Sequence, residues 1–203
     1  SVAAFLSIHN MCAWMVDSFG SPDQRSHWLP KLASMEAIAS YCLTEPGSGS
    51  DAAALRTTAK KQGNELVLNG TKSFISGGSV SDLYVVMART GEDGPKGVST
   101  VLVEKGTEGL SYGALESKMG WNAQPTAEVR FEDCHIPATN LLGDEGAGFK
   151  YAMMGLDGGR LNISACSLGA AQSALDKAVH YMQERKAFGK SLASFQALQF
   201  KLA

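Results

Sequence analysis

Apolar residues recur with helical spacing at the start of the chain. They are Val2, Phe5, Leu6, Ile8, Met11, Trp14 and Met15, and no capping residue precedes them. This pattern predicts a helix from the first residue to shortly before Ser21. A second helix is predicted after it, because Ser21 can act as N-cap, Pro22 suits a first turn and Gln24 can complete a capping box. We expect the second helix to end near Ser34.

From residue 37 to about residue 144 the pattern changes to that of strands separated by glycine-rich turns. The expected strands are 38–43, 65–68, 71–75, 83–88, 99–103 and 127–131. Asn69-Gly70 between two of them predicts a tight hairpin, since this pair readily adopts positive φ angles. In the last strand Ala127, Val129 and Phe131 alternate with charged residues, which predicts one solvated face. Strands without intervening helices indicate a mostly antiparallel sheet or barrel.

Helical spacing returns from Gly146 onward. One apolar stripe is formed by Leu161, Leu168, Ala171, Leu175, Ala178 and Met182. Small residues dominate between Asn162 and Leu175, so we expect an interior or interface helix. The order of elements predicts a division into residues 1–36, 37–145 and 146–203. Because helical patterns run to both chain ends without caps or stop signals, we expect a fragment of a longer protein.

Composition removes several classes of function. The 203 residues carry a formal net charge of -2, which disfavours a nucleic-acid partner. The uncharged stretch from Ser1 to Val16 contains His9 and Asn10 and is too short to span a bilayer, so no membrane insertion is expected. Four scattered cysteines form no CxxC pair, and the four histidines share no ligand spacing. We therefore expect free thiols and no metal site.

The densest group of candidate functional residues runs from Tyr41 to Asp51, where a strand enters a Gly/Ser turn. Gly47 and Gly49 would let a polar ligand lie close to the main chain. The turn lacks the Lys-Ser/Thr ending of a P-loop and the GxGxxG dinucleotide pattern. On this segment alone, an ordinary strand-to-loop corner stays open as the alternative.

The segment Tyr41-Cys42-Leu43-Thr44-Glu45-Pro46-Gly47-Ser48-Gly49-Ser50-Asp51 resembles the signature of the acyl-CoA dehydrogenase family, FAD enzymes that desaturate acyl-CoA thioesters. Further resemblances follow in family order at 69–78, 118–121, 129–131, 135–137, 140–143, 146–149, Asp157, Arg160 and 184–196. The resemblance implies an α+β fold. Its parts would be partial N-terminal helices, a central antiparallel β-barrel or two-sheet domain that binds flavin and acyl-CoA, and the beginning of a C-terminal helical bundle.

The resemblance also implies the FAD-binding residues. They are Tyr41, Cys42, Leu43, Thr44, Gly49, Ser50, Phe74, Ile75, Ser76, Arg185, Phe188, Phe195 and Gln196. Phe74 matches an aromatic that packs on the flavin, and Ser76 matches a hydroxyl that faces the flavin N5 region. Arg185 matches an arginine that reaches the FAD of a neighbouring subunit. Without the resemblance, Phe74 would be a core residue, Ser76 a hairpin residue and Arg185 part of a solvated charge cluster.

The CoA part of the substrate is implied to contact Ser50, Asp157, Gly158, Gly159 and Arg160. Without the resemblance, Arg160 would be an exposed residue at a helix junction. The family reaction removes an α proton to a carboxylate base and passes a β hydride to FAD. The resemblance places the base C-terminal to Ala203. None of Glu45, Glu104, Glu116, Asp144 and Asp157 matches a base position, so no catalytic residue is assigned in this chain.

The overall likeness is to members that act on a short branched acyl-CoA in valine catabolism in the mitochondrial matrix. These would form homo-oligomers, expected as tetramers, and pass electrons to an electron-transfer flavoprotein. Two alternatives stay open. An acyl-CoA oxidase-like enzyme would pass electrons to oxygen, and a truncated isoform would act as a non-catalytic binding module.

Overall fold

The computed structural model describes residues 2 to 203 and divides into two compact units, Ser1–Arg160 and Leu161–Ala203. The long helix α3 (Gly148–Glu184) contributes its first turns to the first unit and the remainder to the second. The expected helix–strand–helix order is confirmed, and with it the α+β fold class. Each unit is described separately below.

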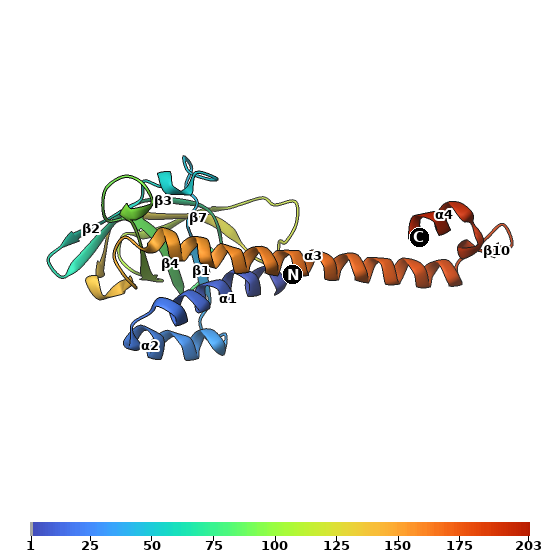
Figure 1. Ribbon diagram of the computed structural model, residues 1–203, viewed down its shortest axis with the longest axis horizontal. Coiled ribbons are helices and arrows are strands. Elements are labelled where there is room, and N and C mark those ends of the chain that lie inside the picture. The colour runs from blue at the N-terminus through green and yellow to red at the C-terminus, as the bar shows by residue number, and fades with distance from the viewer. Residues whose placement is uncertain (1) are drawn as a thin grey trace. The chain divides into compact units, whose positions relative to one another are not determined.

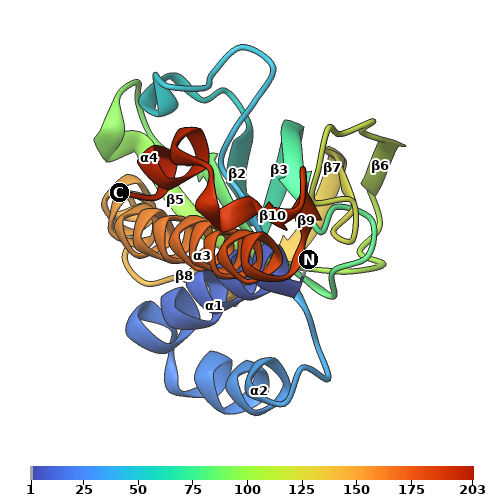
Figure 2. The ribbon, with the colours of Figure 1, turned by 90° about the vertical axis from the view of Figure 1, so that its right-hand side faces the viewer.

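Two helices open the first unit, as the apolar spacing predicted. They are α1 (Val2–Phe19) and α2 (Pro22–Ala33). The capping box at the start of α2 is confirmed, since the Ser21 hydroxyl accepts from the Gln24 amide and the Gln24 side chain accepts from the Ser21 amide. Figure 1 shows α1 between α2 and β1, the first strand of the sheet, and in Figure 2 both helices lie on one side of the sheet.

An eight-stranded sheet forms the centre of the first unit. Its strands are β1 (Ala39–Cys42), β2 (Thr58–Gln62), β3 (Glu65–Ser76), β4 (Leu83–Arg89), β5 (Val98–Glu104), β6 (Leu110–Leu115), β7 (Thr126–Pro137) and β8 (Leu141–Leu142). The order is β6-β7-β3-β2-β4-β5-β8, with β1 beside β4. Most pairs are antiparallel as expected, but β1 runs parallel to β4, and β2 meets β4 in a parallel pair at Thr58 and Arg89.

The hairpin predicted at Asn69-Gly70 is wrong, because β3 runs straight through these residues. Gly70 has φ +147° and sits at a shift in the β3–β7 register, which is typical of a β-bulge. A Cβ on Gly70 would lie 2.5 Å from the Thr57 Oγ1. The glycine is therefore needed because Thr57 packs closely against β3, and not because the chain reverses there. The chain reverses instead at the turn between β2 and β3, where Gly63 adopts φ +60°.

Three strands of this sheet, β2, β6 and the two-residue β8, are absent from the sequence-based expectation. Strand β2 reads Thr-Ala-Lys-Lys-Gln and exposes most of its length, while β6 is at best half-buried throughout. Neither offers the strict apolar alternation on which strand prediction depends. The alternation expected between Ala127 and Phe131 is confirmed, with the apolar residues buried and Arg130 exposed.

Strand β4 separates two apolar clusters, one on each face of the sheet. Leu83, Val85 and Met87 pack among residues of α1, α2 and α3, whereas Tyr84, Val86 and Ala88 pack among residues of β3, β5 and β7. Successive side chains of a strand point to opposite faces, so a strand buried on both sides must be apolar throughout. This central position places β1 next to β4 and under α1.

Short 3-10 turns complete the first unit at Ala52–Ala54, Pro95–Gly97 and Ala138–Asn140. The second unit contains the rest of α3, the short strands β9 (Lys186–Ala187) and β10 (Lys190–Ser191), a 3-10 turn at Leu192–Ser194 and helix α4 (Gln196–Leu202). Among residues 2–203, no helix combines the length and apolar character needed to cross a bilayer.

The small-residue segment between Asn162 and Leu175 is helical as predicted but not interior to the chain. Leu161 and Leu168 are each more than 70% exposed, and Leu175 is 44% exposed. Met182 is the member of the predicted stripe that is buried. The expectation of an interface role for this helix stays a prediction.

Candidate functional site

A pocket of about 340 Å³ opens in the first unit, where β1, the following Gly/Ser loop, the end of β3 and the first turns of α3 converge. Predicted site residues from each of these segments line it: Tyr41, Leu43, Thr44, Gly49, Ser50, Phe74, Ile75, Ser76 and Arg160. The remaining lining is apolar and consists of Ile8, Ala52, Phe149, Met153 and Leu156. The wall is thus mainly hydrophobic with a few hydroxyl groups and one cation.

Strand alternation decides which residues of β1 face the pocket. Tyr41 and Leu43 line it, whereas Cys42 lies between them in the opposite core and is fully buried. Burial raises the pKa of the Cys42 thiol to about 12, although the nearby charge of Lys72 opposes the shift. The structure therefore places the Cys42 side chain outside the pocket, so the predicted flavin contact of Cys42, which stays a prediction, would be made by its main chain.

The Tyr41 side chain bridges the strand and the helix that flank the pocket. Its hydroxyl donates to the Ala152 carbonyl of α3 over 3.1 Å. Burial raises the pKa of Tyr41 well above its ordinary value, so the phenol stays a neutral donor. This hydrogen bond joins residues 111 positions apart and fixes the spacing of two walls of the site.

Arg160 was predicted, but the apolar part of the helical wall was missed in the sequence analysis, although it carries a readable signal. Phe149, Met153, Leu156 and Arg160 follow one another at intervals of four, three and four residues, and so share one face of α3. The predicted pattern from Gly146 onward concerned the stripe further along the helix. This run of three apolar residues followed by an arginine on one helix face could have been recognised in the sequence, and it would have indicated the helical wall of the pocket.

Phe74 adopts an unusual backbone conformation at the rim of the pocket. Its φ is +57°, in the left-handed region that bulky residues rarely adopt, and its side chain is 66% exposed. The register between β3 and β7 shifts between Lys72 and Ile75, which lets Phe74 leave the regular pleat. The structure therefore contradicts the alternative that Phe74 is a core residue.

The Gly/Ser loop keeps its shape through its own hydrogen bonds. Glu45 and Ser48 form a small antiparallel bridge through their main chains, and the Ser48 hydroxyl donates to the Asp51 carbonyl over 2.7 Å. Gly49 lines the pocket, and a Cβ placed there would meet nothing within 4 Å. The loop is thus locally rigid while open space remains beside Gly49.

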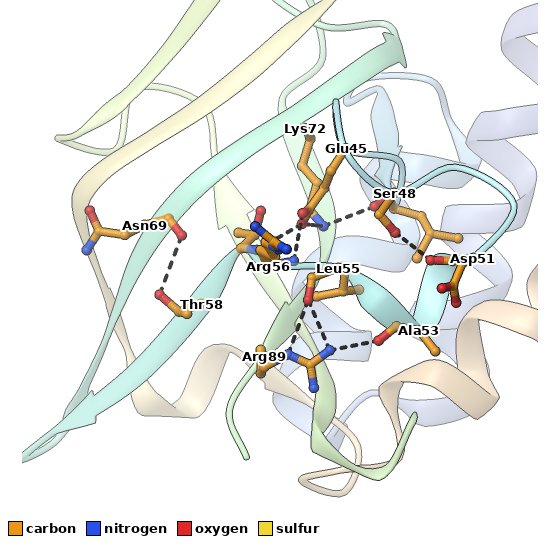
Figure 3. Close-up of polar contacts among 12 residues, drawn as sticks. Glu45, Ser48, Asp51, Ala53, Leu55, Arg56, Thr58, Asn69, Lys72 and Arg89 are labelled. Atoms are coloured by element: carbon orange, nitrogen blue, oxygen red, sulfur yellow. Dashed lines mark hydrogen bonds and ion pairs between the residues drawn. The ribbon is translucent and has the colours of Figure 1, made fainter. Parts of the chain in front are cut away.

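A buried ion pair anchors the loop to the sheet (Figure 3). The Lys72 ammonium donates to the Glu45 Oε1 over 2.7 Å and to the Leu43 carbonyl over 3.0 Å. The Glu45 carboxylate also accepts from the main-chain amides of Arg56 and Thr57. Lys72 is 0% exposed and Glu45 is 7% exposed, so the charges are removed from water but fully hydrogen-bonded.

This network determines what Glu45 can do chemically. Burial by itself raises the pKa of the Glu45 carboxyl, but the Lys72 charge and the three donors outweigh burial and hold the pKa below its usual value. A carboxylate with a lowered pKa and occupied oxygens is a poor proton acceptor. No aspartate or glutamate is among the described residues that line the pocket.

A second arginine, Arg89, supports the other side of the loop. It donates to the carbonyls of Leu55 and Ala53 at 2.8 to 3.1 Å, as Figure 3 shows, and also to those of Glu92 and Gly94. These bonds hold the 3-10 turn after the loop against β4. Arg89 therefore stabilises this turn through main-chain carbonyls.

The predicted CoA-contacting residues are only partly brought together. Ser50 and Arg160 line the pocket, whereas Asp157, Gly158 and Gly159 lie on α3 beside it. The Asp157 carboxylate accepts from the Arg160 guanidinium over 2.5 Å in an exposed pair. The structure thus places Asp157 where it orients Arg160.

Four predicted FAD-binding residues lie in the second unit. Arg185 follows α3, and Gln196 begins α4. Phe188 has φ +53° and is 95% exposed, and its ring contacts Phe195 edge-on with centroids 6.3 Å apart. The Lys190 ammonium lies over the Phe195 ring at 4.6 Å. Phe188 and the half-buried Phe195 thus form an aromatic pair, with the Lys190 ammonium beside it.

The cysteines in the described part of the chain are free, and all but the half-buried Cys166 are buried. Over residues 2–203, no group of three or more His, Cys, Asp and Glu is arranged to hold a metal ion.

Three family models match this chain in sequence order. They describe the N-terminal domain of acyl-CoA dehydrogenase at residues 1–36, the middle domain at 40–134 and the C-terminal domain at 146–203. Together they cover nearly every element described above, including all segments that line the pocket.

Among curated proteins, the chain is 58% identical to mitochondrial isobutyryl-CoA dehydrogenase of Bos taurus over 203 residues and 59% identical to that of Dictyostelium discoideum over 204 residues. Each alignment covers 100% of this chain and 49% of the relative, so the chain spans about half the length of these proteins.

Among solved structures, a glutaryl-CoA dehydrogenase of Mycobacterium smegmatis in complex with FADH2 superimposes with a TM-score of 0.90 at 33% identity. The match covers 98% of this chain and 50% of that one. The order of the domains, the sequence identity and the shared architecture agree with the pocket geometry. We conclude that this chain belongs to the acyl-CoA dehydrogenase family.

Proposed function

We propose that the gene product containing this chain is an FAD-dependent acyl-CoA dehydrogenase that converts isobutyryl-CoA to methacrylyl-CoA in valine catabolism. The observation that carries the proposal is the pocket, which gathers the predicted residues of β1, the Gly/Ser loop and β3. The choice of substrate is supported by the relatives from Bos taurus and Dictyostelium discoideum, which are named for isobutyryl-CoA.

The donor set of the pocket fits a flavin ring. Within the described part of the chain, the hydroxyls of Thr44 and Ser76 have no hydrogen-bond partner, although both residues line the pocket. Leu43, Ile75 and Phe74 offer apolar surface beside them. A flat ring with an apolar face and a polar rim matches this arrangement of groups.

Bound FAD would supply a hydride acceptor for the β hydrogen of the thioester. Thr44 and Ser76 would donate hydrogen bonds to the polar rim of the ring and thereby orient it. Phe74, held in its left-handed conformation, would cover one part of the ring against water. Tyr41, tied to α3 by its hydroxyl, would keep the walls at a fixed spacing.

Ser50 and Arg160 would bind the polar CoA portion of the substrate. A guanidinium suits phosphate oxygens because its donors form a planar fork. Asp157 would hold Arg160 in the required orientation through the exposed ion pair. Gly158 and Gly159, beside that pair, would let a ligand approach the helix closely.

The chain by itself would be inactive, because the reaction needs a carboxylate base and the described pocket residues include none. Glu45 cannot serve, since its carboxylate is buried and ion-paired with Lys72. The family resemblance assigns the base to a segment C-terminal to Ala203.

The assembly and location are proposed on the same basis. Arg185, with Phe188, Phe195 and Gln196, would contact the FAD of a neighbouring subunit in a homotetramer. Electrons would pass to an electron-transfer flavoprotein. The names of the two relatives support a mitochondrial location, and the matrix is proposed from the family resemblance alone. The domains would divide at residues 1–36, 37–145 and 146–203.

The test is anaerobic titration of the purified gene product with FAD and then with isobutyryl-CoA, followed by absorbance. We expect a bound flavin band that bleaches with isobutyryl-CoA, and regains its colour faster with electron-transfer flavoprotein than with air. The 203-residue chain should show no bleaching. Absence of flavin binding by the gene product would overturn the proposal, and bleaching in the chain alone would overturn the assignment of the base.

A further inference from the structure

Two buried serines lie directly behind the end of β3 that lines the pocket. Ser40 of β1 and Ser81, which precedes β4, are both 0% exposed. The Ser40 hydroxyl lies 2.7 Å from the Ser76 carbonyl and 2.8 Å from the Ser81 hydroxyl. Neither Ser40 nor Ser81 lines the pocket itself.

The number of available protons decides which group donates in each of these two hydrogen bonds. A serine hydroxyl carries one proton, and the carbonyl of Ser76 can only accept. Ser40 must therefore donate to the Ser76 carbonyl, which leaves Ser40 to accept from Ser81. The result is a chain of two hydrogen bonds that runs from Ser81 through Ser40 to the main chain of Ser76.

The neighbouring main chain holds the three serines of this hydrogen-bond chain in place. Gly77 follows with φ +81°, and a Cβ there would lie 2.5 Å from the Ser81 Oγ and 2.7 Å from the Ser40 Oγ. The Gly77 amide donates to the Pro125 carbonyl over 2.8 Å, and the Ser81 amide donates to the Gly77 carbonyl over 2.9 Å. The peptide between Ser76 and Gly77 is thus held from several sides.

We propose that the Ser81–Ser40 hydrogen-bond chain positions Ser76 for its contact with the flavin, so that Ser40 and Ser81 are positioning residues. This inference rests on the proposed function. Holding the Ser76 carbonyl restrains the backbone of Ser76 and thus the direction of its Cα–Cβ bond, from which the hydroxyl reaches the pocket. A donor aimed in advance binds more strongly than one that must be ordered on binding.

The test compares Ser40→Ala and Ser81→Ala with a matched control, Ser99→Ala, in the whole gene product. Ser99 is also 0% exposed, and its hydroxyl pairs with Thr90 over 2.6 Å and accepts from the Gly146 amide over 2.8 Å. Neither Ser99 nor its partners Thr90 and Gly146 line the pocket. The measurements are the FAD dissociation constant, the position of the bound flavin absorption band and the apoprotein Tm.

We expect Ser40→Ala to raise the FAD dissociation constant about tenfold and to shift the flavin band, because one hydrogen bond of ordering is lost. Ser81→Ala should raise it less, since the bond from Ser40 to Ser76 remains. Ser99→Ala should lower Tm similarly without a change in flavin affinity or band position. If Ser40→Ala does not fold, the contrast of Ser81→Ala with Ser99→Ala decides.

Equal effects of the Ser40 and Ser99 substitutions on flavin affinity would overturn the positioning role and assign Ser40 a purely structural one. An unshifted flavin band in Ser40→Ala and Ser81→Ala would overturn it as well. Failure of the unsubstituted protein to bind FAD would overturn the proposed function together with this inference, so the two failures can be told apart.

Discussion

At the scale of single residues, the Glu45–Lys72 pair is the most consequential contact in the first unit. Lys72 is completely buried yet charged, and its partners are one carboxylate and one carbonyl. Removing either charge from such a pair leaves the other without compensation in a low-dielectric interior. The pair also joins the loop after β1 to β3, so its loss affects both walls of the pocket.

We expect Lys72→Met to lower the free energy of unfolding by about 3–5 kcal/mol, because the Glu45 carboxylate would stay buried without its counter-ion. The double substitution with Glu45→Gln should recover part of this loss. Urea unfolding of the single and double variants checks both statements. An effect of Lys72→Met no larger than that of an exposed lysine substitution, such as Lys60→Met, would contradict the buried-pair account.

The same pair gives the protein a defined sensitivity to acid. The pKa of Glu45 is below its ordinary value of 4.5 in the folded state, so folding stability gained from its ionisation is fully present above about pH 4.5. That contribution is lost as pH falls through the lowered folded-state pKa. Thermal unfolding between pH 7 and pH 3 should therefore show a steeper acid loss of Tm than in the Glu45→Gln, Lys72→Met variant. Parallel curves would contradict this origin.

At the scale of elements, local chemistry predicted helices better than strands. The capping box at Ser21 and Gln24 is confirmed because all its groups lie within one turn. The hairpin at Asn69-Gly70 is wrong because the same glycine also suits a bulge, and the close approach of Thr57 decides between the two. Strands β2 and β6 escaped prediction because their stability comes from pairing with β3 and β7 rather than from their own apolar pattern.

Two of the five glycines of helix α3, Gly155 and Gly158, have different surroundings. A Cβ on Gly158 would meet nothing within 4 Å, whereas one on Gly155 would lie 3.2 Å from a side-chain carbon of Met11. We expect Gly158→Ala to raise the free energy of unfolding by about 1 kcal/mol through helix propensity alone. Gly155→Ala, the control, should gain less or lose stability. Thermal unfolding without ligands checks the difference, and equal gains would contradict the packing at Gly155.

At the scale of the whole molecule, the sequence predicted many residues that line the pocket but not how they are arranged around it. Family motifs supplied Tyr41, Thr44, Phe74 and Ser76, and the structure gathers them around one cavity. The predicted strand puts Tyr41 and Cys42 on opposite faces, but no sequence pattern shows which face lines the cavity or that Ile8 of α1 reaches it. Such assignments depend on how distant elements pack, which no local pattern contains.

The packing of α3 differs along its length, so we expect its two ends to differ in local stability. Residues 149–156 pack against the first unit's core, whereas most side chains from residue 161 to 181 are exposed. A helix without packing is only marginally stable in water. Hydrogen exchange of the isolated chain should therefore be faster at residues 161–181 than at 149–156. Equal protection in a monomeric sample would contradict this expectation.

The hydrogen bond from Tyr41 to Ala152 has a consequence for the order of folding. The cavity wall closes only when a strand near the beginning of the chain meets a helix more than a hundred residues later. Contacts of such high sequence separation carry a large loop-closure entropy and form late. During synthesis, the site could not be completed until α3 had left the ribosome. The residues that line the pocket are therefore brought together only in the finished first unit.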